Sequence, residues 1–195
     1  MRLLAFSDVH CDLEACAALV AAASDADLVI GAGDYAQMHD GLAPTMDALA
    51  PLAGKAVLIP GNNETDTALR AATAAMVIHC ETVTRGGLVI AGIGCAVPPL
   101  PPHVGSFDMT EDAAAQVLDA IPAADILVTH SPPAGIADRL RDGRRVGSHA
   151  VRAAIVRLQP RLVLCGHIHD CWGEEGRIGA SWIRNLGPRP NWVEI

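Results

Sequence analysis

Short apolar runs alternate with alanine-rich segments along this chain, and the two kinds of segment differ in period. The runs have the length of buried β-strands and are followed by Gly, Asp, Asn or His. They span Leu3–Phe6, Leu28–Ile30, Ala56–Ile59, Leu88–Ala91, Ile126–Val128 and Leu162–Leu164. The segments between them have helical spacing and span Asp12–Ala23, Glu64–Ala75, Glu111–Ile121 and Ser148–Leu158. This alternation predicts βαβ units in a largely parallel sheet that is flanked by helices.

Two regions break the alternation and predict β-hairpins. They are residues 76–94, with Arg85-Gly86-Gly87 as a turn, and residues 177–193. The two hairpins indicate a second sheet that contains antiparallel strands. The proline-rich segment 98–103 cannot pair in a central strand, so we expect a surface loop there.

Single residues refine the boundaries of the predicted helices. Thr110 and Ser148 precede two of them and are suited to act as N-caps. Pro44 and Pro51 predict that the helix between them is short or irregular.

The composition is that of an ordinary globular protein. A length of 195 residues favours one domain over residues 1–195, and 51% hydrophobic with 18% charged residues excludes the disordered, collagen-like and disulfide-scaffold classes. The formal net charge of -8 argues against binding to duplex nucleic acid or to an anionic membrane surface. The six cysteines show no Cys-x-x-Cys spacing, so we expect free thiols with a structural role.

The apolar segments also bear on the location of the protein. Polar residues follow the first run at Ser7 and Asp8, which is too early for a secretory signal, so the chain is expected in the cytoplasm. The longest apolar run, Ala15–Ala23, has less than half of the roughly 20 residues that a membrane span requires. No membrane partner is therefore expected.

Side chains that can bind metals follow five of the apolar runs. In sheets of this kind ligands bind beyond the carboxyl ends of the strands, so these positions should meet at one edge. A single Asp or His at such a place is usually structural, but their occurrence in one register favours a common site. The candidate ligands are Asp8, His10, Asp34, Asn62, His130, His167 and His169.

The mixture of donors indicates which metals to expect. Imidazole together with carboxylate and amide oxygens suits Mn, Fe or Zn better than Ca or Mg. Seven ligands are too many for one tetrahedral ion. They fit two ions that share a carboxylate and lie about 3.5 to 4 Å apart.

The order of these blocks resembles that of the calcineurin-like metallophosphoesterase superfamily. The resemblance rests on Asp8-x-His10, Gly33-Asp34, Gly61-Asn62, His130 and Gly166-His167-x-His169, which extend over nearly the whole chain. The stretch 129–133, Thr-His-Ser-Pro-Pro, further resembles a small cytoplasmic phosphodiesterase-like branch without a regulatory domain.

This resemblance implies a fold and a division of the ligands. The fold is α/β, with two mixed β-sheets packed as a sandwich between helical layers. Asp34 would bridge two divalent transition-metal ions, with Mn2+ as the first choice and Fe, Zn or Co as alternatives. Asp8, His10 and His169 would hold one ion, and Asn62, His130 and His167 the other. Gly61 and Gly166 would allow the sharp turns that aim the next side chains at the metals.

One position departs from the family pattern. The family usually has His directly after the metal-binding Asn, where it assists the leaving group, and this chain has Asn63. An amide can donate a hydrogen bond to phosphate but cannot deliver a proton near neutral pH. The acid role is therefore vacant, or is filled by His103, His149 or a water molecule on the metals.

Several other residues have two interpretations. Ser148 is most simply an N-cap, with a phosphate contact at the helix start as a secondary reading. Trp172 either lines a substrate pocket or covers the site. The arginine run from Arg139 to Arg145 is either solvated or guides an anionic substrate.

These observations favour a dinuclear metal-dependent phosphoesterase that hydrolyses phosphodiesters by attack of a metal-bridging hydroxide. A phosphomonoesterase or nucleotidase is an alternative, as is a binding scaffold that has lost catalysis, for which Asn63 is the evidence. The expected partner is a small phosphoester, and a homodimer is left open. Duplex nucleic acid is disfavoured by the acidity and by the 3% of aromatic residues.

Overall fold

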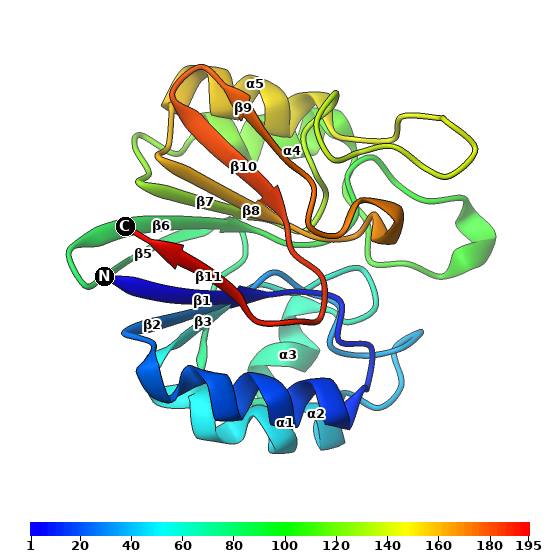
Figure 1. The fold of residues 1–195 in the computed structure, drawn as a ribbon. Helices are drawn as coiled ribbons and strands as arrows, with labels where there is room; N and C mark the ends of the chain where they lie inside the picture. The colour runs from blue at the N-terminus through cyan, green and yellow to red at the C-terminus, as the bar shows by residue number, and fades with distance from the viewer.

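Four layers make up the fold, in the order helix, sheet, sheet, helix (Figure 1). This computed structural model describes residues 1–195, with the side chain of His103 excepted. The helices are α1 (Leu13–Ala22), α2 (Leu42–Leu49), α3 (Asp66–Ala72), α4 (Glu111–Asp119) and α5 (His149–Leu158). Short 3-10 turns lie at Ala23–Asp25, Ala50–Lys55, Pro102–Val104 and His169–Cys171.

The first sheet has five strands in the order β11-β1-β2-β3-β4. The strands are β1 (Arg2–Phe6), β2 (Leu28–Gly31), β3 (Ala56–Leu58), β4 (Met76–Val77) and β11 (Asn191–Glu194). All neighbours run parallel except β11, which pairs antiparallel with β1. Helices α1, α2 and α3 cover the outer face of this sheet (Figure 1).

The second sheet has six strands in the order β5-β6-β7-β8-β10-β9. The strands are β5 (Glu81–Arg85), β6 (Leu88–Ile93), β7 (Ile126–Thr129), β8 (Leu162–Cys165), β9 (Glu175–Ile178) and β10 (Ser181–Asn185). The four inner strands are parallel, and β5 and β9 pair antiparallel at the two edges. Helices α4 and α5 cover its outer face (Figure 1).

Successive residues of the strands point into different layers. In β1, Leu3 and Ala5 pack between the two sheets, whereas Leu4 and Phe6 pack against the helices. Both sets are fully buried. This explains why the strands appear in the sequence as unbroken apolar runs rather than as alternating ones.

The structure confirms the predicted class, two mixed β-sheets with flanking helices, and corrects its details. The strands expected in one largely parallel sheet are divided between two sheets. Residues Met76–Val77 were expected in a hairpin and instead pair parallel with β3. The end of the second hairpin region likewise leaves the hairpin, because Asn191–Glu194 pairs with β1.

The helix boundaries follow the caps. The side chains of Thr110 and Ser148 accept the N–H groups of Ala113 and Val151, as expected of N-caps. Helix α3 is shorter than predicted because Thr65 is its N-cap, which leaves Glu64 outside the helix. None of the helices that the structure describes combines the length and the apolar character needed to cross a membrane.

Candidate metal centre

All the candidate ligands lie on loops that leave the carboxyl ends of parallel strands. The loops after β1, β2 and β3 belong to the first sheet, and those after β7 and β8 belong to the second. These strand ends face the same side of the sandwich (Figure 1). The structure thus brings residues from the two sheets together at the seam between them.

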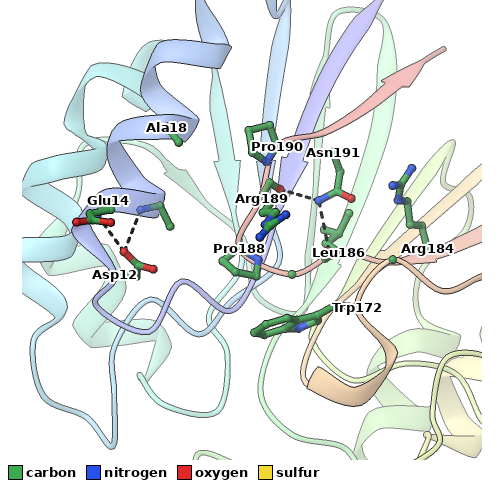
Figure 2. A pocket seen from close by; sticks show the side chains of 13 residues that line it. Asp12, Glu14, Ala18, Trp172, Arg184, Leu186, Pro188, Arg189, Pro190 and Asn191 are labelled. Atoms are coloured by element: carbon green, nitrogen blue, oxygen red, sulfur yellow. Dashed lines mark hydrogen bonds between the residues drawn. The ribbon is translucent and has the colours of Figure 1, made fainter.

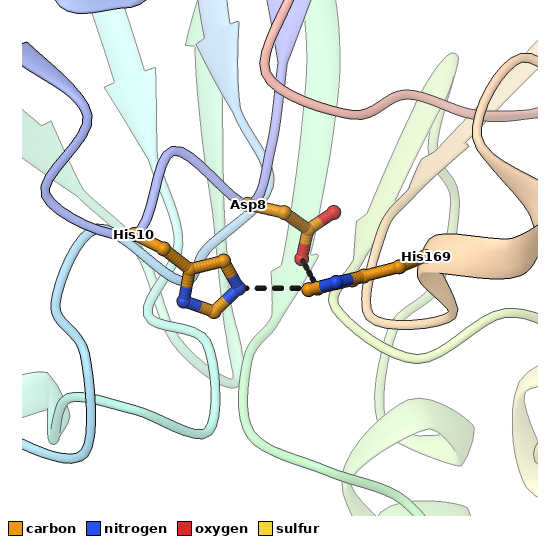
Figure 3. A group of neighbouring side chains, drawn as sticks. All are labelled: Asp8, His10 and His169. Carbon is orange, nitrogen blue, oxygen red and sulfur yellow. Dashed lines mark hydrogen bonds and ion pairs between the residues drawn. The ribbon is translucent and has the colours of Figure 1, made fainter.

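One group consists of Asp8, His10 and His169, whose ligand atoms lie within 4.8 Å of one another (Figure 3). The Nε2 atoms of His10 and His169 are 3.1 Å apart. Asp8 Oδ1 lies 3.9 Å from His169 Nε2. Asp8 is buried and His169 is half exposed, so this group opens toward solvent.

The second group consists of Asp34, His130 and His167, and its ligand atoms also lie within 4.8 Å of one another. Asn62 joins it, since its Oδ1 lies 3.0 Å from His130 Nε2. Asp34 and His130 are buried. This group is therefore the deeper of the two.

Asp34 lies between the two groups. Its Oδ2 is 3.5 Å from His10 Nε2 and 3.4 Å from His130 Nε2. One carboxylate oxygen thus faces a ligand nitrogen from each group. The full set of imidazole nitrogens, carboxylate oxygens and one amide oxygen matches the preference of first-row transition metals, so each group could hold one such ion.

Backbone carbonyls orient two of the imidazoles. The Nδ1 atoms of His10 and His130 lie 3.1 and 2.8 Å from the carbonyl oxygens of Ala36 and Ala32. A proton on Nδ1 would be donated to these carbonyls, which leaves Nε2 as the atom for a metal.

Three donors hold the Asp8 carboxylate. The Ser7 hydroxyl and the Trp172 indole N–H donate to Oδ2 at 2.5 and 3.1 Å, and the backbone N–H of His167 donates to Oδ1 at 3.0 Å. The Trp172 ring also packs on that of His169, with centroids 4.5 Å apart. Trp172 thus supports two ligands of the same group.

Several ligands have strained backbones. Asp8, His10, Asp34 and His167 have φ angles of 54°, 42°, 60° and 68°, in the left-handed region that residues other than glycine rarely adopt. Each such residue costs on the order of 1–3 kcal/mol and persists where the surroundings fix it. The sharp turns therefore fall on the ligands themselves.

The two glycines expected to make these turns have a different role. Neither Gly61 nor Gly166 has a positive φ. A Cβ on Gly61 would collide with the side chain and the backbone nitrogen of Asp34, and one on Gly166 would lie 2.6 Å from Asp8 Oδ2. Glycine is required at both positions because a metal-binding carboxylate packs directly against the backbone.

Glu64, which was predicted to begin a helix, instead connects two of the loops that carry candidate ligands. Its side chain is 1% exposed and accepts four backbone N–H groups, which connect the loop after β2 with the loop after β3. Burial, followed by the nearby Asp34 carboxylate, raises the pKa of Glu64. The donors are the N–H groups of Asp34, Tyr35, Ala36 and Gly61, at 2.9, 3.0, 3.0 and 2.6 Å.

Asn63, which was expected to contact phosphate, holds the Asp34 carboxylate. Its backbone N–H donates to Asp34 Oδ1 at 2.9 Å, and its Nδ2 donates to Asp34 Oδ2 at 2.8 Å. Its Oδ1 accepts the N–H of Met38 at 2.8 Å. The side chain is thus fixed at both ends, with one Nδ2 hydrogen left to donate.

The structure does not bring His149 to the ligands. His149 is exposed at the first position of α5, and its backbone N–H donates to Glu111. The Glu111 carboxylate also accepts from Ser148 Oγ and Ala150 N, so it fills the helix start where a phosphate contact was a secondary expectation. The other expected proton donor, His103, has its side chain outside the described part of the chain.

The arginine run is neutralised by neighbouring carboxylates. Arg139 pairs with Glu174 at 3.9 Å, Arg141 with Asp170 at 3.4 Å and Arg144 with Asp142 at 2.8 Å. Arg145 pairs with the buried Asp138. These pairs favour the solvated, structural interpretation of the run over a role in guiding an anionic substrate.

Burial and mutual charge shift the pKa values of the residues in the deeper ligand group. Burial alone would lower the pKa of His130, but the adjacent Asp34 carboxylate outweighs it and raises this pKa to about 9. The pKa of Asp34 moves in the opposite direction, well below its usual range, since His130 and His10 outweigh the effect of burial. Burial and the charge on His130 lower the pKa of His167 to about 3, which keeps this imidazole neutral and able to bind a metal.

Comparison with known proteins identifies the family of this chain. The family model described as the calcineurin-like phosphoesterase superfamily domain matches residues 1–190. UPF0046 protein T07D4.2 of Caenorhabditis elegans is 33% identical over 87 residues, which cover 42% of this chain and only 22% of that protein.

Two solved structures share the fold at low identity. TT1561 of Thermus thermophilus superimposes with a TM-score of 0.71 at 19% identity, covering 98% of this chain and 97% of the other. Purple acid phosphatase PPD1 from yellow lupin (Lupinus luteus) gives 0.59 at 13% identity, covering 100% of this chain and 46% of the other.

Proposed function

Because this chain belongs to the calcineurin-like phosphoesterase superfamily, we propose that it is a phosphodiesterase that works with two divalent metal ions, Mn2+ in the first instance. The observation that supports a dinuclear centre is the position of Asp34. Its Oδ2 lies within 3.5 Å of a histidine nitrogen from each ligand group, which suits a carboxylate that bridges two ions.

The division of ligands follows the geometry. Asp8, His10 and His169 would hold the more exposed ion. Asn62, His130 and His167 would hold the deeper one, with Asp34 shared. When bound, the two ions would supply Lewis acidity toward phosphate oxygens and lower the pKa of water toward about 7.

The charge around the site favours a diester over a monoester. A phosphodiester carries one negative charge, whereas a monoester carries close to two near pH 7. The arginine run is paired with carboxylates, and the position after Asn62 has a neutral amide. With the arginine run paired and a neutral amide after Asn62, the site suits the substrate with the smaller charge.

The protein residues have three tasks in this proposal. The carbonyls of Ala32 and Ala36 keep His130 and His10 in the tautomer that binds metal. Asn63 keeps the Asp34 carboxylate in place and has a second Nδ2 hydrogen for a phosphate oxygen. Asn63 cannot deliver a proton to a leaving group, and we propose that the reaction depends on good leaving groups.

This proposal is tested with purified protein that is stripped by a chelator and reloaded separately with Mn2+, Zn2+, Fe2+ or Co2+. Metal content is measured together with hydrolysis of bis(4-nitrophenyl) phosphate and 4-nitrophenyl phosphate. We expect about two ions per chain and kcat/KM at least about tenfold higher for the diester, a difference of roughly 1.4 kcal/mol.

Other outcomes identify the alternatives. Faster turnover of the monoester would assign a phosphomonoesterase or nucleotidase instead. Two bound ions without turnover of any ester would favour the binding scaffold, for which the neutral Asn63 is the supporting observation.

A further inference from the structure

A groove of about 810 Å³ is lined by the residues drawn in Figure 2, and Trp172 connects it to the candidate metal centre. Its walls come from the start of α1, from Trp172 and from the loop at residues 186–191. Trp172 is shared with the metal centre, because its N–H donates to Asp8 and its ring packs on His169. Trp172 therefore belongs both to the wall of the groove and to the surroundings of the candidate metal ligands.

The groove is joined to the metal centre by further contacts. The backbone N–H of Gly187 donates to Ser7 Oγ at 2.9 Å, and the same hydroxyl donates to Asp8 Oδ2. Gly187 also packs against the indole, since a Cβ there would lie 2.8 Å from Trp172 Cγ. One wall of the groove is thus fixed to a metal ligand.

The lining has opposite charges on its two sides. Asp12 and Glu14 lie at the start of α1, whereas Arg184 lies on the other side of Trp172 and the exposed Arg189 lies in the loop at residues 186–191 (Figure 2). Arg184 pairs with Glu175 at 3.1 Å, yet its buried Nε–H has no hydrogen-bond partner among the described residues. Ala18, Leu186 and the prolines at 188 and 190 supply apolar surface between them.

We propose that this groove binds the second alcohol of a phosphodiester and that this alcohol is a polyol, such as glycerol or a sugar. The proposal rests on the proposed phosphodiesterase function. A carboxylate only accepts hydrogen bonds and a guanidinium only donates them, whereas a hydroxyl does both. A polyol therefore satisfies every part of the groove, while a cationic group suits only Asp12 and Glu14, and an anionic group suits only Arg184 and Arg189.

The indole ring of Trp172 provides an apolar surface against which the carbon atoms of a polyol can pack. Its side chain is 40% exposed although its N–H is engaged by Asp8. An indole fixed at its polar end offers apolar contact area at little cost in side-chain entropy.

The test uses diesters that share a 4-nitrophenyl leaving group and differ in the second alcohol: methyl, glyceryl, choline and hexyl. We expect kcat/KM for the glyceryl ester to exceed that of the methyl ester by about tenfold, which is the size of one or two net hydrogen bonds. Equal rates for the glyceryl and methyl esters would refute the groove as a subsite. A preference for the choline or hexyl ester would refute the polyol.

Two alanines of α1 provide a matched pair of variants. Ala18 is exposed and lines the groove, whereas Ala17 is exposed on the same helix and does not line it. Ala18→Trp should fill the groove and bring the glyceryl-to-methyl ratio near 1, and Ala17→Trp should leave the ratio unchanged. A ratio that survives in Ala18→Trp would overturn the proposal.

A binding measurement separates this proposal from the proposed function. Glycerol 1-phosphate and methyl phosphate are titrated into the metal-loaded protein by calorimetry, which does not require turnover. Tighter binding of glycerol 1-phosphate that is lost in Ala18→Trp supports the groove even if every ester is inert. Equal binding of the two phosphates refutes it, whether or not the protein is an enzyme.

Discussion

Asn63 holds the Asp34 carboxylate by both oxygens, with its backbone N–H on Oδ1 and its side-chain amide on Oδ2. Because the same Oδ2 faces His10 and His130, Asn63 acts on the atom that is placed to join the two ligand groups. A neutral donor can hold this oxygen without competing for its negative charge. The amide at position 63 is thus a positioning contact for Asp34, and it cannot itself deliver a proton.

Asn63→His tests whether a proton donor at position 63 assists the leaving group. A positioned general acid is worth about 10²- to 10⁴-fold, so the variant should raise the ratio of alkyl-ester to aryl-ester hydrolysis, even if the weaker hold on Asp34 lowers both rates. The ratio is measured at matched metal occupancy. Asn63→Ala serves as the control, because it removes the amide without adding an acid and should leave the ratio low. If the ratio is the same in the wild type and the histidine variant, protonation at position 63 does not limit the reaction.

Asp34→Asn should lower metal content and reduce hydrolysis by at least about 10³-fold, beyond the 10- to 100-fold typical of the groups that only orient ligands. A neutral amide cannot share charge between two cations as a carboxylate does. Metal content is determined by mass spectrometry after dialysis. Asp47→Asn, an exposed change on α2, is the matched control and should retain both metals and activity. Full occupancy and activity in Asp34→Asn would rule out the bridging role.

Metal binding should strengthen as the pH rises toward 9. The pKa of His130 is raised to about 9 by Asp34, and a metal ion must displace this proton. Apparent affinity should therefore increase by up to about tenfold per pH unit between pH 7 and 9. Calorimetry in buffers of different ionisation enthalpy will count the released proton. An affinity that is constant over this range would contradict the assignment.

The same histidine sets the pH dependence of the metal-free protein. A raised pKa means that folded His130 retains its proton when the unfolded residue has lost it. Its stabilising contribution is complete below the unfolded pKa of about 6.5 and is lost as the pH rises through about 9. The free energy of unfolding of chelator-treated protein, measured with urea, should fall over this pH interval. An increase over the same interval would contradict this prediction.

Glu64→Gln should destabilise the protein by about 2 to 4 kcal/mol, since two buried backbone N–H groups would face the new amide nitrogen. Each Glu64 oxygen accepts two of the four N–H groups, so either orientation of glutamine leaves two unpaired. Urea unfolding measures the loss. Glu194→Gln, exposed on β11, should have no measurable effect. Equal stability of the two variants would show that the negative charge of Glu64 is not needed.

Trp172→Phe should weaken metal binding at the exposed group by about 10- to 100-fold. Phenylalanine keeps a ring against His169 but cannot donate to Asp8. Co2+ titrations resolve the two sites by their absorption spectra, and the deeper group should be unaffected. Trp182→Phe is the control, because its N–H donates to Glu175 rather than to a ligand. A uniform loss at both groups would indicate a general structural defect instead.

The sequence alone predicted the features that depend on which residues follow one another along the chain. Apolar runs ending in Asp, Asn or His predicted which residues meet, because parallel strands place their carboxyl ends at one edge. It was insufficient where the outcome depends on long-range pairing. In the first sheet β11 pairs with β1 and β4 pairs with β3, and the period of an apolar run does not specify such partners.

The contacts that support the candidate ligands could not be predicted for a similar reason, because they join residues that are far apart in the sequence. Glu64 looked like the first residue of a helix, and only the fold shows that its carboxylate faces N–H groups about 30 positions earlier. Likewise the left-handed backbones of Asp8 and Asp34 have no signature in their own residue types. Asp8 and Asp34 pack directly against Gly166 and Gly61, which contribute space rather than flexibility.

The position of the ligands at the seam also sets when the site can form during synthesis. Asp8, His10, Asp34 and Asn62 come from the first sheet, and His130, His167 and His169 come from the second. Each group needs residues from both halves of the chain, so no fragment that ends before residue 167 contains a complete group. The proposed metal ions can therefore bind a complete group only after residue 167 has been translated, when β1 to β8 have already been made.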